Sequence, residues 1–331
     1  MNTYGTRFRV TTYGESHGPA VGAVIDGCPA GVNLDMDAIA HELARRREGA
    51  PRQEADAVEW MSGLRDGITL GTPIAFAIHN RNARPEDYDR LEHLFRPGHA
   101  DYTYYMKYGL RDHRGGGRAS ARETTARVVA GAIARQLMPE IEISSEFGVR
   151  SSDVNGCDSE QTDTIGGIVS CRITGLPAGV GEPLFGKLNA ALAAAMMSIP
   201  SAIGFEMGAG FAAANMTGSE YIDRWEECVN SGMCEYASTS ATKTNTLTHS
   251  HIHTISNHCG GIQGGISNGM PVEFRVAFHP VVTLPYPVEC LHEDGHLETV
   301  SVGGRHDRSH VQRAATVVEA MAALCLINYL L

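Results

Sequence analysis

The spacing of hydrophobic and polar residues along the chain predicts a mixture of strands and helices. Short apolar and β-branched runs predict strands over residues 7–13, 21–25, 72–78, 141–149, 168–173 and 270–278. Apolar residues at helical spacing predict helices over residues 35–47, 123–137, 182–197 and 313–331. Because these elements do not alternate with a βαβ rhythm, we expect an α+β fold rather than a doubly wound sheet. No linker divides the chain, so we expect one large domain over residues 1–331.

The composition is that of an ordinary globular protein, with 43% hydrophobic and 20% charged residues. A net charge of -11 argues against a general nucleic-acid-binding protein, whose surface would be basic. Residues 314–331 form the longest apolar stretch, but Glu319 and Asn328 interrupt it. A buried or oligomer-facing terminal helix is therefore favoured over a membrane span. We expect no nucleic-acid partner and no membrane partner.

The cysteines and the N-terminal residues indicate a reducing compartment. None of the eight cysteines belongs to a C-x-x-C pair, and residues 1–10 lack the apolar segment of a secretory signal. A disulfide framework is not expected in a protein that is not secreted. We expect reduced cysteines and a cytoplasmic location.

Arginines are concentrated beside glycines or at a helix end. One cluster is residues 45–47, a second surrounds the glycines at 115–117, and a third, which includes Arg305, follows the glycines at 303–304. Arginine suits bidentate capture of phosphate or carboxylate, and glycine lets the backbone approach a ligand closely. A helix starting directly after residue 117 would also offer its N–H groups to an anion. At most one or two of residues 45–47 can reach a common site from one helix. Each cluster could instead be a solvated or salt-bridged face, but the three together favour a pocket for a ligand with more than one negative group.

Residues 14–18 have the sequence Gly-Glu-Ser-His-Gly and match the G-x-S-x-G elbow of serine hydrolases. An elbow needs a helix directly after the serine, whereas a β-like run follows here. The hydrolase interpretation is therefore disfavoured, and His17 becomes a candidate general acid or base. His99, on a loop before the second arginine cluster, is a similar candidate, unless it is a structural histidine bonded to Asp101.

Alternating histidines give the best metal-ligand pattern in the sequence. His249, His251 and His253 share one face of a possible strand, with His258 and Cys259 nearby. No carboxylate or second cysteine completes a familiar zinc spacing, and residues 239–248 are a polar loop. We expect a polar strand or lid edge here rather than a metal site.

With these motifs in order, the chain resembles the chorismate synthase family from its first residues to its last. The motifs that carry the resemblance are GESHG at residues 14–18 with DG at 26–27 and PAG at 29–31, FRPGHADYTY at 95–104, KYGLRD at 107–112, RGGGRASARET at 114–124, NH at 257–258, GGI at 260–262, GGIS at 264–267, and GRHD at 304–307 with VEAM at 318–321. Several long motifs in the right order are much more specific than any one of them.

The resemblance implies a fold, a reaction and an assembly. The fold is a β-α-β sandwich with a helical core between antiparallel sheets, and the assembly is a homotetramer. The reaction is the FMN-dependent anti-1,4-elimination of phosphate from 5-enolpyruvylshikimate 3-phosphate, which gives chorismate in the shikimate pathway of aromatic amino acid biosynthesis. The resemblance also implies that reduced FMN is required, although the reaction involves no net redox change. The flavin would donate a transient electron that weakens the C–O bond and would then help to remove the C6 proton. No nicotinamide fingerprint is present, so we expect an external reductant, rather than NADP(H) bound to this chain, to supply the reduced flavin.

The resemblance also implies roles for individual residues. His99 would protonate the departing phosphate, His17 would protonate the reduced flavin or hold its charge, and Asp307 would tune the proton at flavin N5. The implied substrate clamp is Arg46, Arg111, Arg122 and Arg305. The implied FMN contacts are Arg118, Ala119, Ser120, Asn257, Gly264, His279, Thr283 and Arg305.

Four departures from the family pattern fall at implied ligand contacts. The loop at residues 48–52 is shortened, a Lys-Pro-Thr segment is replaced by residues 279–283, a lysine is replaced by Ile203, and the proline after Arg-His-Asp is Arg308, followed by Ser309 and His310. A neutral imidazole at His279 does not replace the fixed charge of a lysine. A catalytically impaired or repurposed relative with a binding or structural role is therefore the alternative. The presence of His17, His99 and Asp307 favours the active enzyme.

Overall fold

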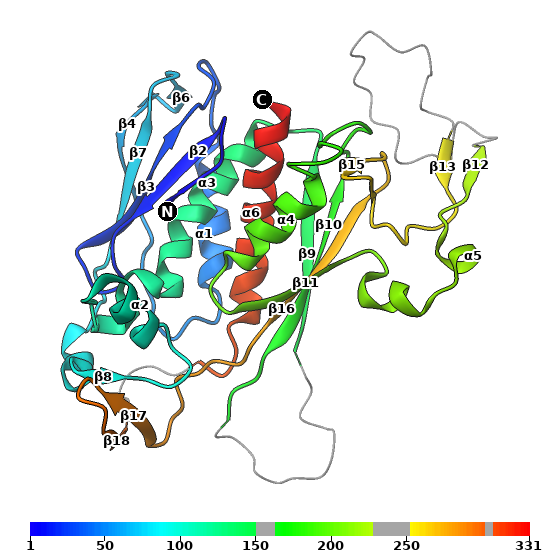
Figure 1. The fold of residues 1–331 in the computed structure, drawn as a ribbon. Helices are drawn as coiled ribbons and strands as arrows, with labels where there is room; N and C mark the ends of the chain where they lie inside the picture. The colour runs from blue at the N-terminus through cyan, green and yellow to red at the C-terminus, as the bar shows by residue number, and fades with distance from the viewer. Residues whose placement is uncertain (150–162, 228–251, 302–306) are drawn as a thin grey trace.

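Two antiparallel sheets enclose a layer of helices (Figure 1). The computed structural model describes residues 1–149, 163–227, 252–301 and 307–331. The first sheet has the order β1-β2-β3-β7-β4, with bounds Thr3–Tyr4, Arg9–Tyr13, Ala20–Asp26, Ile74–His79 and Val58–Ser62. The second has the order β11-β16-β10-β9, with bounds Ala202–Met207, Val272–Phe278, Gly167–Thr174 and Glu142–Val149.

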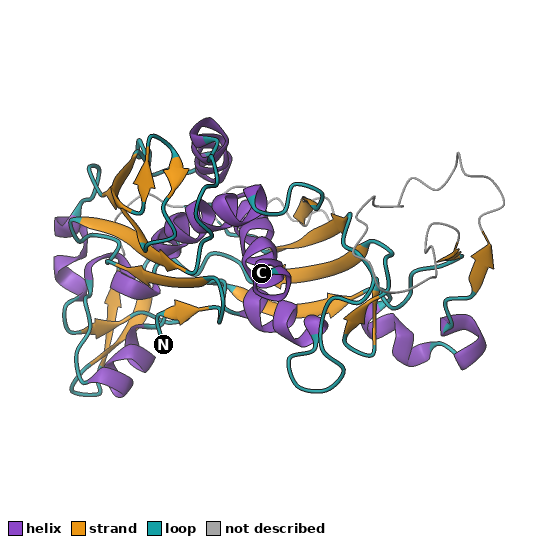
Figure 2. Ribbon diagram, turned by 90° about the horizontal axis from the view of Figure 1, so that it is seen from above, coloured by secondary structure: helices purple, strands orange, loops and turns teal. Residues whose placement is uncertain are grey.

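The helical layer lies between the sheets when the molecule is viewed from above (Figure 2). Its members are α1 (Met36–Arg47), α3 (Thr124–Gln136), α4 (Leu188–Met197) and α6 (Val311–Leu330). Helix α3 contacts β3 of the first sheet, and α6 contacts β9 and β10 of the second. One hydrophobic cluster runs from Phe8 to Ile327 through both sheets and all four helices. This arrangement confirms the expected α+β sandwich with a helical core.

The remaining elements are short and lie outside this sandwich. Helix α2 (Asp101–Tyr108) and a small sheet of β18 (Leu297–Val300), β17 (Val288–His292) and β8 (Leu94–Phe95) lie at one end. The others are α5 (Gly218–Tyr221) and the strand pairs β5 (Leu64–Arg65) with β6 (Ile68–Thr69), β12 (Trp225–Glu227) with β13 (Ile252–Thr254), and β14 (Ile262–Gln263) with β15 (Ile266–Ser267). Of these short elements, only β13 overlaps a segment that was considered as a strand from the sequence, residues 249–253.

Helix boundaries follow local chemistry. Asp35 caps α1 by accepting a hydrogen bond from the Ala38 N–H at 2.9 Å. The helix predicted over residues 182–197 was wrong in its first turn and a half, because α4 begins at Leu188. Gly186 has a φ of 78° and Leu184 and Phe185 are exposed, so this segment is a turn on the surface.

Helix α6 is the apolar terminal helix for which the sequence analysis favoured a buried or oligomer-facing position over a membrane span. It is long and apolar enough to cross a membrane by length and composition alone. In the structure its side chains from Val311 to Ile327 are mostly buried against α1, α3, α4, β9 and β10. It is the core helix of this domain.

The crossing of α3 and α6 requires a glycine. A β-carbon at Gly131 of α3 would lie 2.5 Å from the β-carbon of Ala320 and 2.6 Å from its α-carbon. Real carbon atoms do not approach so closely, so the two backbones touch at this point with no room for a side chain on α3. The small residues at this crossing set how closely the two helices pack.

A buried carboxylate connects the helical layer to the second sheet. Glu319 of α6 is 2% exposed. It accepts hydrogen bonds from Arg45 of α1 at 2.8 and 3.0 Å, from Arg135 of α3 at 3.2 Å and from the Ser145 hydroxyl of β9 at 2.7 Å. Burial raises its pKa, but the hydrogen bond from Arg45 and the other two partners outweigh this, so the pKa of Glu319 is lowered overall.

Replacing Glu319 by Gln is expected to lower the free energy of unfolding by about 3 kcal/mol, because two guanidinium groups lose a buried countercharge. The stabilising effect of a carboxylate with a lowered folded-state pKa is complete above its unfolded pKa and is lost as the pH falls through the folded value. The loss of stability between neutral and acidic pH should therefore be smaller in Glu319→Gln than in the wild type. Chemical unfolding at several pH values measures both effects.

The matched control is Glu42→Gln, because Glu42 contacts the same two arginines at 2.8 and 3.6 Å from a more exposed position. We expect this variant to lose about 1 kcal/mol or less. Equal losses for the two variants would contradict the role given to Glu319.

Candidate active site

A cavity of about 540 Å³ lies where the C-terminal end of α1 meets the segments that precede α3 and α6. Its described lining residues fall within segments 16–17, 46–56, 96–101, 115–122, 279–283 and 307–313, together with Tyr88, Pro200 and Ser201. A volume of this size is usual for a small-molecule site. Segments from almost the whole length of the chain therefore meet at one place.

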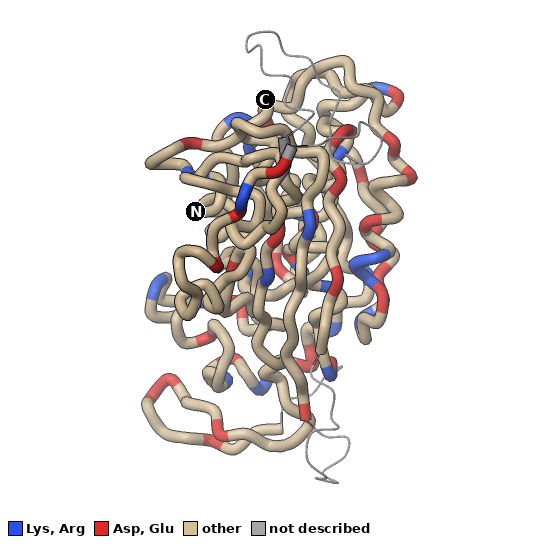
Figure 3. Tube along the Cα trace, turned by 90° about the vertical axis from the view of Figure 1, so that its right-hand side faces the viewer, with Lys and Arg blue, Asp and Glu red and all other residues tan. Residues whose placement is uncertain are grey.

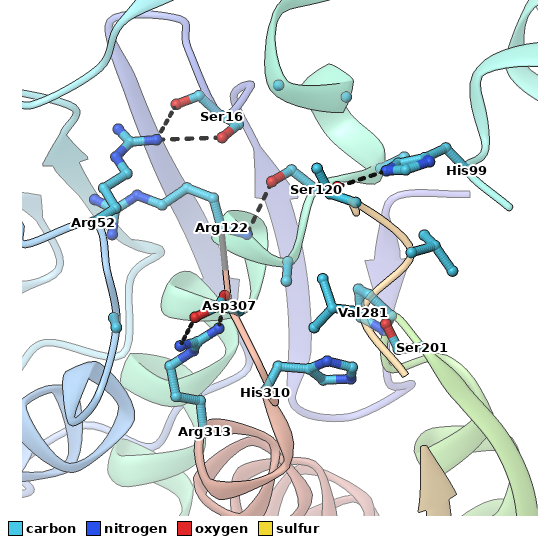
Figure 4. Close-up of a pocket in the computed structure, with 18 of the residues that line it drawn as sticks. Ser16, Arg52, His99, Ser120, Arg122, Ser201, Val281, Asp307, His310 and Arg313 are labelled. Atoms are coloured by element: carbon cyan, nitrogen blue, oxygen red, sulfur yellow. Dashed lines mark hydrogen bonds and ion pairs between the residues drawn. The ribbon is translucent and has the colours of Figure 1, made fainter. Parts of the chain in front are cut away.

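Most of the site residues inferred from the sequence reach this cavity. The three candidate catalytic residues, His17, His99 and Asp307, all contribute to its wall. Figure 4 shows Asp307 and Arg122 on the opposite side of the space from His99. The other inferred residues on the wall are Arg46, Arg122, Ala119, Ser120, His279 and Thr283.

Arg111, inferred to bind substrate, is not part of the cavity wall. Its Nη2 donates to the carbonyl oxygens of Leu91 and Leu94, each at 2.6 Å, and its guanidinium lies 5.4 Å from the ring centre of Phe95. Burial lowers its pKa, although Asp101 nearby partly offsets this. In this structure Arg111 holds the chain around β8 in place, so its position does not support a substrate contact.

Three inferred flavin contacts also lie away from the cavity wall. Arg118 donates to Thr12 of β2, and the Asn257 side chain bridges Pro271 and Gly261 by hydrogen bonds of 2.9 and 2.7 Å. Gly264 lies in the tight turn between β14 and β15. These residues shape other parts of the fold in the single chain. Arg305, inferred to contact both ligands, lies outside the described residues.

The described cavity wall carries more positive than negative charge. Six of its residues are arginines and four are carboxylates. Each carboxylate is paired with an arginine of the wall, in the pairs Arg52–Glu54, Arg96–Asp101, Arg122–Asp56 and Arg313–Asp307, and Asp101 also lies 3.9 Å from Arg111 outside the wall. Arg46 and Arg47 are the two arginines of this described wall without a carboxylate partner. The surplus of two charges lies inside a protein that is acidic overall, in which acidic and basic residues are interspersed along the face seen in Figure 3.

The three consecutive arginines at the end of α1 diverge, as helix geometry predicted. Arg45 turns to Glu319, whereas Arg46 and Arg47 reach the cavity. Arg46 is buried and donates to the Thr124 hydroxyl and the Ala121 carbonyl. Burial, and then the nearby Arg122, lower the pKa of Arg46 to about 10, which still leaves it charged at neutral pH. An anionic ligand would relieve this unfavourable placement of two cations.

Arg122 has one donor atom left for a ligand. Its Nη1 binds the Asp56 carboxylate at 2.5 Å, and its Nε donates to the Asn80 side-chain oxygen at 2.9 Å. Its Nη2 is buried without a partner among the described residues. An unpaired buried N–H of a guanidinium is costly unless a ligand accepts from it.

His17 is held against the glycine-rich turn that follows α2. A β-carbon at Gly115 would lie 2.5 Å from Cδ2 and 2.7 Å from Nε2 of the His17 ring, and Gly115 has a φ of 59°. Tyr88 packs edge-on against the same ring, with centroids 4.9 Å apart. The His17 Nδ1 is buried without a partner among the described residues. Burial, and then Arg52, lower the pKa of His17.

The helix expected directly after the glycine run is absent. No helix starts directly after Gly117: short 3₁₀ turns follow, and α3 begins at Thr124. Glycine at position 115 instead makes room for the catalytic-type histidine, and Gly115 and Gly116 themselves form part of the cavity wall.

His99 has a fixed tautomer in this structure. Its Nδ1–H donates to the Pro97 carbonyl at 3.0 Å, so its Nε2 accepts the hydrogen bond from the Thr283 hydroxyl, also at 3.0 Å. Asp101, considered as a partner from the sequence, binds Arg96 instead. Burial, and then Arg96, lower the pKa of His99 to about 4. Without a ligand the imidazole is therefore neutral at pH 7.

Asp307 and Arg313 form a two-pronged ion pair at the start of α6. Beside this pair, His310 precedes the first residue of α6 and points toward Val281 and Ser201 in Figure 4. Its Nε2 is buried without a partner among the described residues. The pair and His310 place one end of α6 in the cavity wall.

Several wall residues were not assigned a role from the sequence. Arg52 donates to the Ser16 carbonyl at 2.9 Å and binds Glu54, so the shortened loop still brings a cation to the cavity. Arg96 and Arg313 lie inside or close to the motifs that carried the resemblance, which is a signal that could have found them. His310 was noted in the sequence only as part of the departure after the Arg-His-Asp triplet, and only the fold shows that it lies beside residues 279–283.

The histidines considered as metal ligands are only partly described. His249 and His251 and the side chain of His253 lie outside the described residues. His258 Nδ1 lies 3.2 Å from the Asp223 carboxylate, so this imidazole has a carboxylate partner within the protein. Among described residues, His292, Asp294 and His296 have ligand atoms within 4.8 Å of one another on the exposed turn after β17, away from the cavity.

Comparisons with known proteins agree along the whole chain. The model of the chorismate synthase family matches residues 8–157 and 152–331. The chain is 46% identical to chorismate synthase of Porphyromonas gingivalis, over 99% of this chain and 95% of that protein. It is 43% identical to chorismate synthase of Phocaeicola vulgatus, over 100% of this chain and 98% of that protein. A crystal structure of chorismate synthase matches with a TM-score of 0.71 and 28% identity, covering 99% of this chain and 92% of that one.

These matches extend over both sheets, the helical layer and the described cavity wall. The identity is high enough, and the coverage complete enough, to carry the reaction class as well as the fold. The chain belongs to the chorismate synthase family and is a carbon–oxygen lyase that acts on a phosphorylated substrate.

Proposed function

We propose that the cavity converts 5-enolpyruvylshikimate 3-phosphate to chorismate with reduced FMN bound beside the substrate. The observation that carries this proposal is the meeting of His17, His99 and Asp307 in one wall that has a surplus of two positive charges. A substrate with one phosphate and two carboxylates is complementary to such a wall.

The reaction removes phosphate from C3 and a proton from C6 of the substrate ring. The electrons of the C6–H bond form a double bond between C6 and C1, those of the existing C1–C2 double bond move to C2–C3, and the C3–O bond electrons leave with phosphate. Substrate and products have the same oxidation state, so the elimination consumes no reductant. The protein has to bind a highly charged substrate, receive one proton and assist a leaving group.

The residues present fit a flavin as the second occupant of the cavity. Among the buried polar atoms without partners in the described part of the chain, His17 Nδ1, Arg122 Nη2 and His310 Nε2 belong to residues of this wall. Ala119, Ser120, His279 and Thr283 are the inferred flavin contacts that reach it. When bound, reduced FMN supplies a transient electron that weakens the C–O bond and assists removal of the C6 proton. We propose that these four residues hold it.

The arginines would hold the anionic groups of the substrate. Within the described wall, Arg46 and Arg47 have no carboxylate of their own, and Arg122 has its unpartnered Nη2. The four arginine–carboxylate pairs fix the positions of the surrounding side chains before a ligand arrives. Preorganised donors of this kind stabilise developing negative charge without a cost of rearrangement.

His99 has to gain a proton before it can protonate the departing phosphate. Its pKa of about 4 reflects burial and the Arg96 cation in the absence of a ligand. A phosphate dianion beside the ring would favour the imidazolium and raise this pKa. Substrate binding would thus convert His99 from a neutral ring bonded to Thr283 into a general acid.

His17 and Asp307 would act at the flavin side of the cavity. His17 has a buried Nδ1 without a described partner and a ring position set by Gly115 and Tyr88, so it offers a fixed donor or acceptor. The Asp307 carboxylate is oriented by Arg313. We propose that His17 holds charge or a proton next to the reduced flavin, and that Asp307 tunes the proton at N5.

We also propose that the enzyme works as a homotetramer in the cytoplasm, with an external reductant for the flavin. Large apolar side chains are exposed on the surface of the single chain, among them Phe185 at 93%, Phe211 at 81% and Trp225 at 60%. Exposed apolar groups of this size are typical of subunit interfaces. The five described cysteines are free, which is compatible with a reducing compartment.

The alternative of a non-catalytic relative rested on the diverged ligand contacts. Identity of 46% over nearly the whole length of a chorismate synthase does not favour it. The geometry does not favour it either, because the shortened loop still places Arg52 in the wall and the replaced segment still places Thr283 against His99.

Replacing His99 by Ala is expected to lower kcat about 10²- to 10⁴-fold, because the departing phosphate loses its proton donor. The measurement is phosphate release from 5-enolpyruvylshikimate 3-phosphate with FMN and dithionite. The control is His93→Ala, which removes an exposed imidazole outside the cavity and should leave the rate unchanged. An unchanged rate in His99→Ala would show that its assigned role is wrong.

Replacing Arg122 by Lys is expected to raise KM for the substrate about tenfold or more. The lysine keeps a charge for Asp56 but loses the planar guanidinium and its unpartnered Nη2–H. Arg111→Lys is the matched comparison, since the structure places Arg111 outside the wall: it should lower thermal stability and leave KM nearly unchanged. The opposite result, with KM raised only in Arg111→Lys, would restore the substrate contact inferred from the sequence.

A further inference from the structure

His310 is the wall residue for which the proposed reaction gives no role. It lies between the Asp307–Arg313 pair and residues 279–283, and its own helix does not use its side chain as a cap. Its ring is packed edge-on to Phe278, with centroids 6.1 Å apart. This contact restricts the orientation of the imidazole, which forms part of the cavity wall.

A second imidazole lies beside it. The rings of His279 and His310 have centroids 6.3 Å apart at an angle of 71°, too far for a direct hydrogen bond. His279 Nδ1–H donates to the Pro280 carbonyl at 2.6 Å, which leaves its Nε2 for another partner. His310 Nε2 is buried and has no partner among the described residues. Each of these neighbouring rings thus has one nitrogen atom without a hydrogen-bond partner among the described residues.

The charges around His310 keep it neutral until an anion arrives. The charged and titratable groups that face it are Arg313 and Asp307 from its own segment and His279 from the loop after β16. Burial is the largest cause that lowers the pKa of His310, to about 4, and Arg313 and His279 contribute in the same direction. An anionic oxygen placed between the rings would reverse the effect of these neighbours.

We propose that His310 and His279 form an imidazole pair that binds an anionic group of a cavity ligand and takes up a proton as that ligand binds. The pair stands where the resemblance implies a lysine with a fixed charge, so the cation forms here only when the ligand is present. The identification of the ligand as the substrate or the flavin rests on the proposed function. The binding of an anion by the two imidazoles does not depend on it.

The sign of the linkage sets the pH range of the effect. Below about pH 4 the free protein already carries the proton on His310, so binding takes up none there. Above the raised pKa of the complex the ring stays neutral in both states. Proton uptake is therefore expected between these limits, which include pH 6.5 if the anion restores an ordinary imidazole pKa of about 6.5 or more.

The test is calorimetric titration at pH 6.5 in two buffers of different ionisation enthalpy. FMN alone is titrated first, and 5-enolpyruvylshikimate 3-phosphate is then titrated with oxidised FMN and no reductant, so that no turnover occurs. In one of these titrations we expect the wild type to take up about half a proton to one proton more than His310→Gln, and Kd of that ligand to rise about tenfold in the variant. The titration that shows the difference identifies the ligand.

The control is His41→Gln, which removes an exposed imidazole on α1 outside the cavity and should behave as the wild type in both titrations. His279→Gln is measured beside His310→Gln, so that the question stays answerable if one variant fails to fold. Equal proton uptake and equal Kd in wild type and folded variants, for both ligands, would overturn the proposal. Absence of phosphate release from the reduced wild type would instead refute the proposed function and leave this result standing.

Discussion

The contact network of Glu319 is the interaction on which the rest of the structure depends. One carboxylate on α6 binds side chains from α1, α3 and β9, and so connects three helices of the central layer with the second sheet. Burying such a group without its partners would be strongly destabilising, so the positions of the four elements depend on one another. The backbone contact between Gly131 and Ala320 then brings α3 and α6 to their closest approach. With these positions fixed, the end of α1 and the segments before α3 and α6 meet around one cavity.

The cavity separates two uses of arginine. Four of its described arginines are paired with carboxylates and act as a rigid frame, whereas Arg46 and Arg47 bind only uncharged oxygens of the described chain. The four ion pairs have no net charge, so the positive charges of Arg46 and Arg47 are available to bind a ligand. Burial lowers the pKa of His99 and of His310, so both imidazoles are uncharged in the free protein. An anion bound beside them would raise these pKa values and add positive charge to the wall. An acidic protein can in this way attract a highly anionic substrate to one internal surface.

Predictions from the sequence were accurate where local chemistry decides the structure and weaker where distant packing does. The cap at Asp35 and the helix over residues 123–137 follow from local signals, and both are present. Residues 182–187 had helical composition, but Gly186 turns the chain there. Arg111 has the same side chain as Arg122 and lies in an equally distinctive motif. Only the three-dimensional structure shows that Arg111 binds the carbonyls around β8 away from the cavity and that Arg122 lies in the cavity wall.

The sequence by itself determined the α+β class, the acidic character and, through its ordered motifs, the family and the identity of His17, His99 and Asp307 as candidates. These properties are carried by residues close together in the chain, or by composition. The tertiary structure decided which side chains share the cavity, which arginines are already neutralised, and that His310 lies beside His279. Those facts depend on contacts between segments that are distant in the chain, such as Arg45 with Glu319, and on burial, which sets pKa values that no local pattern encodes.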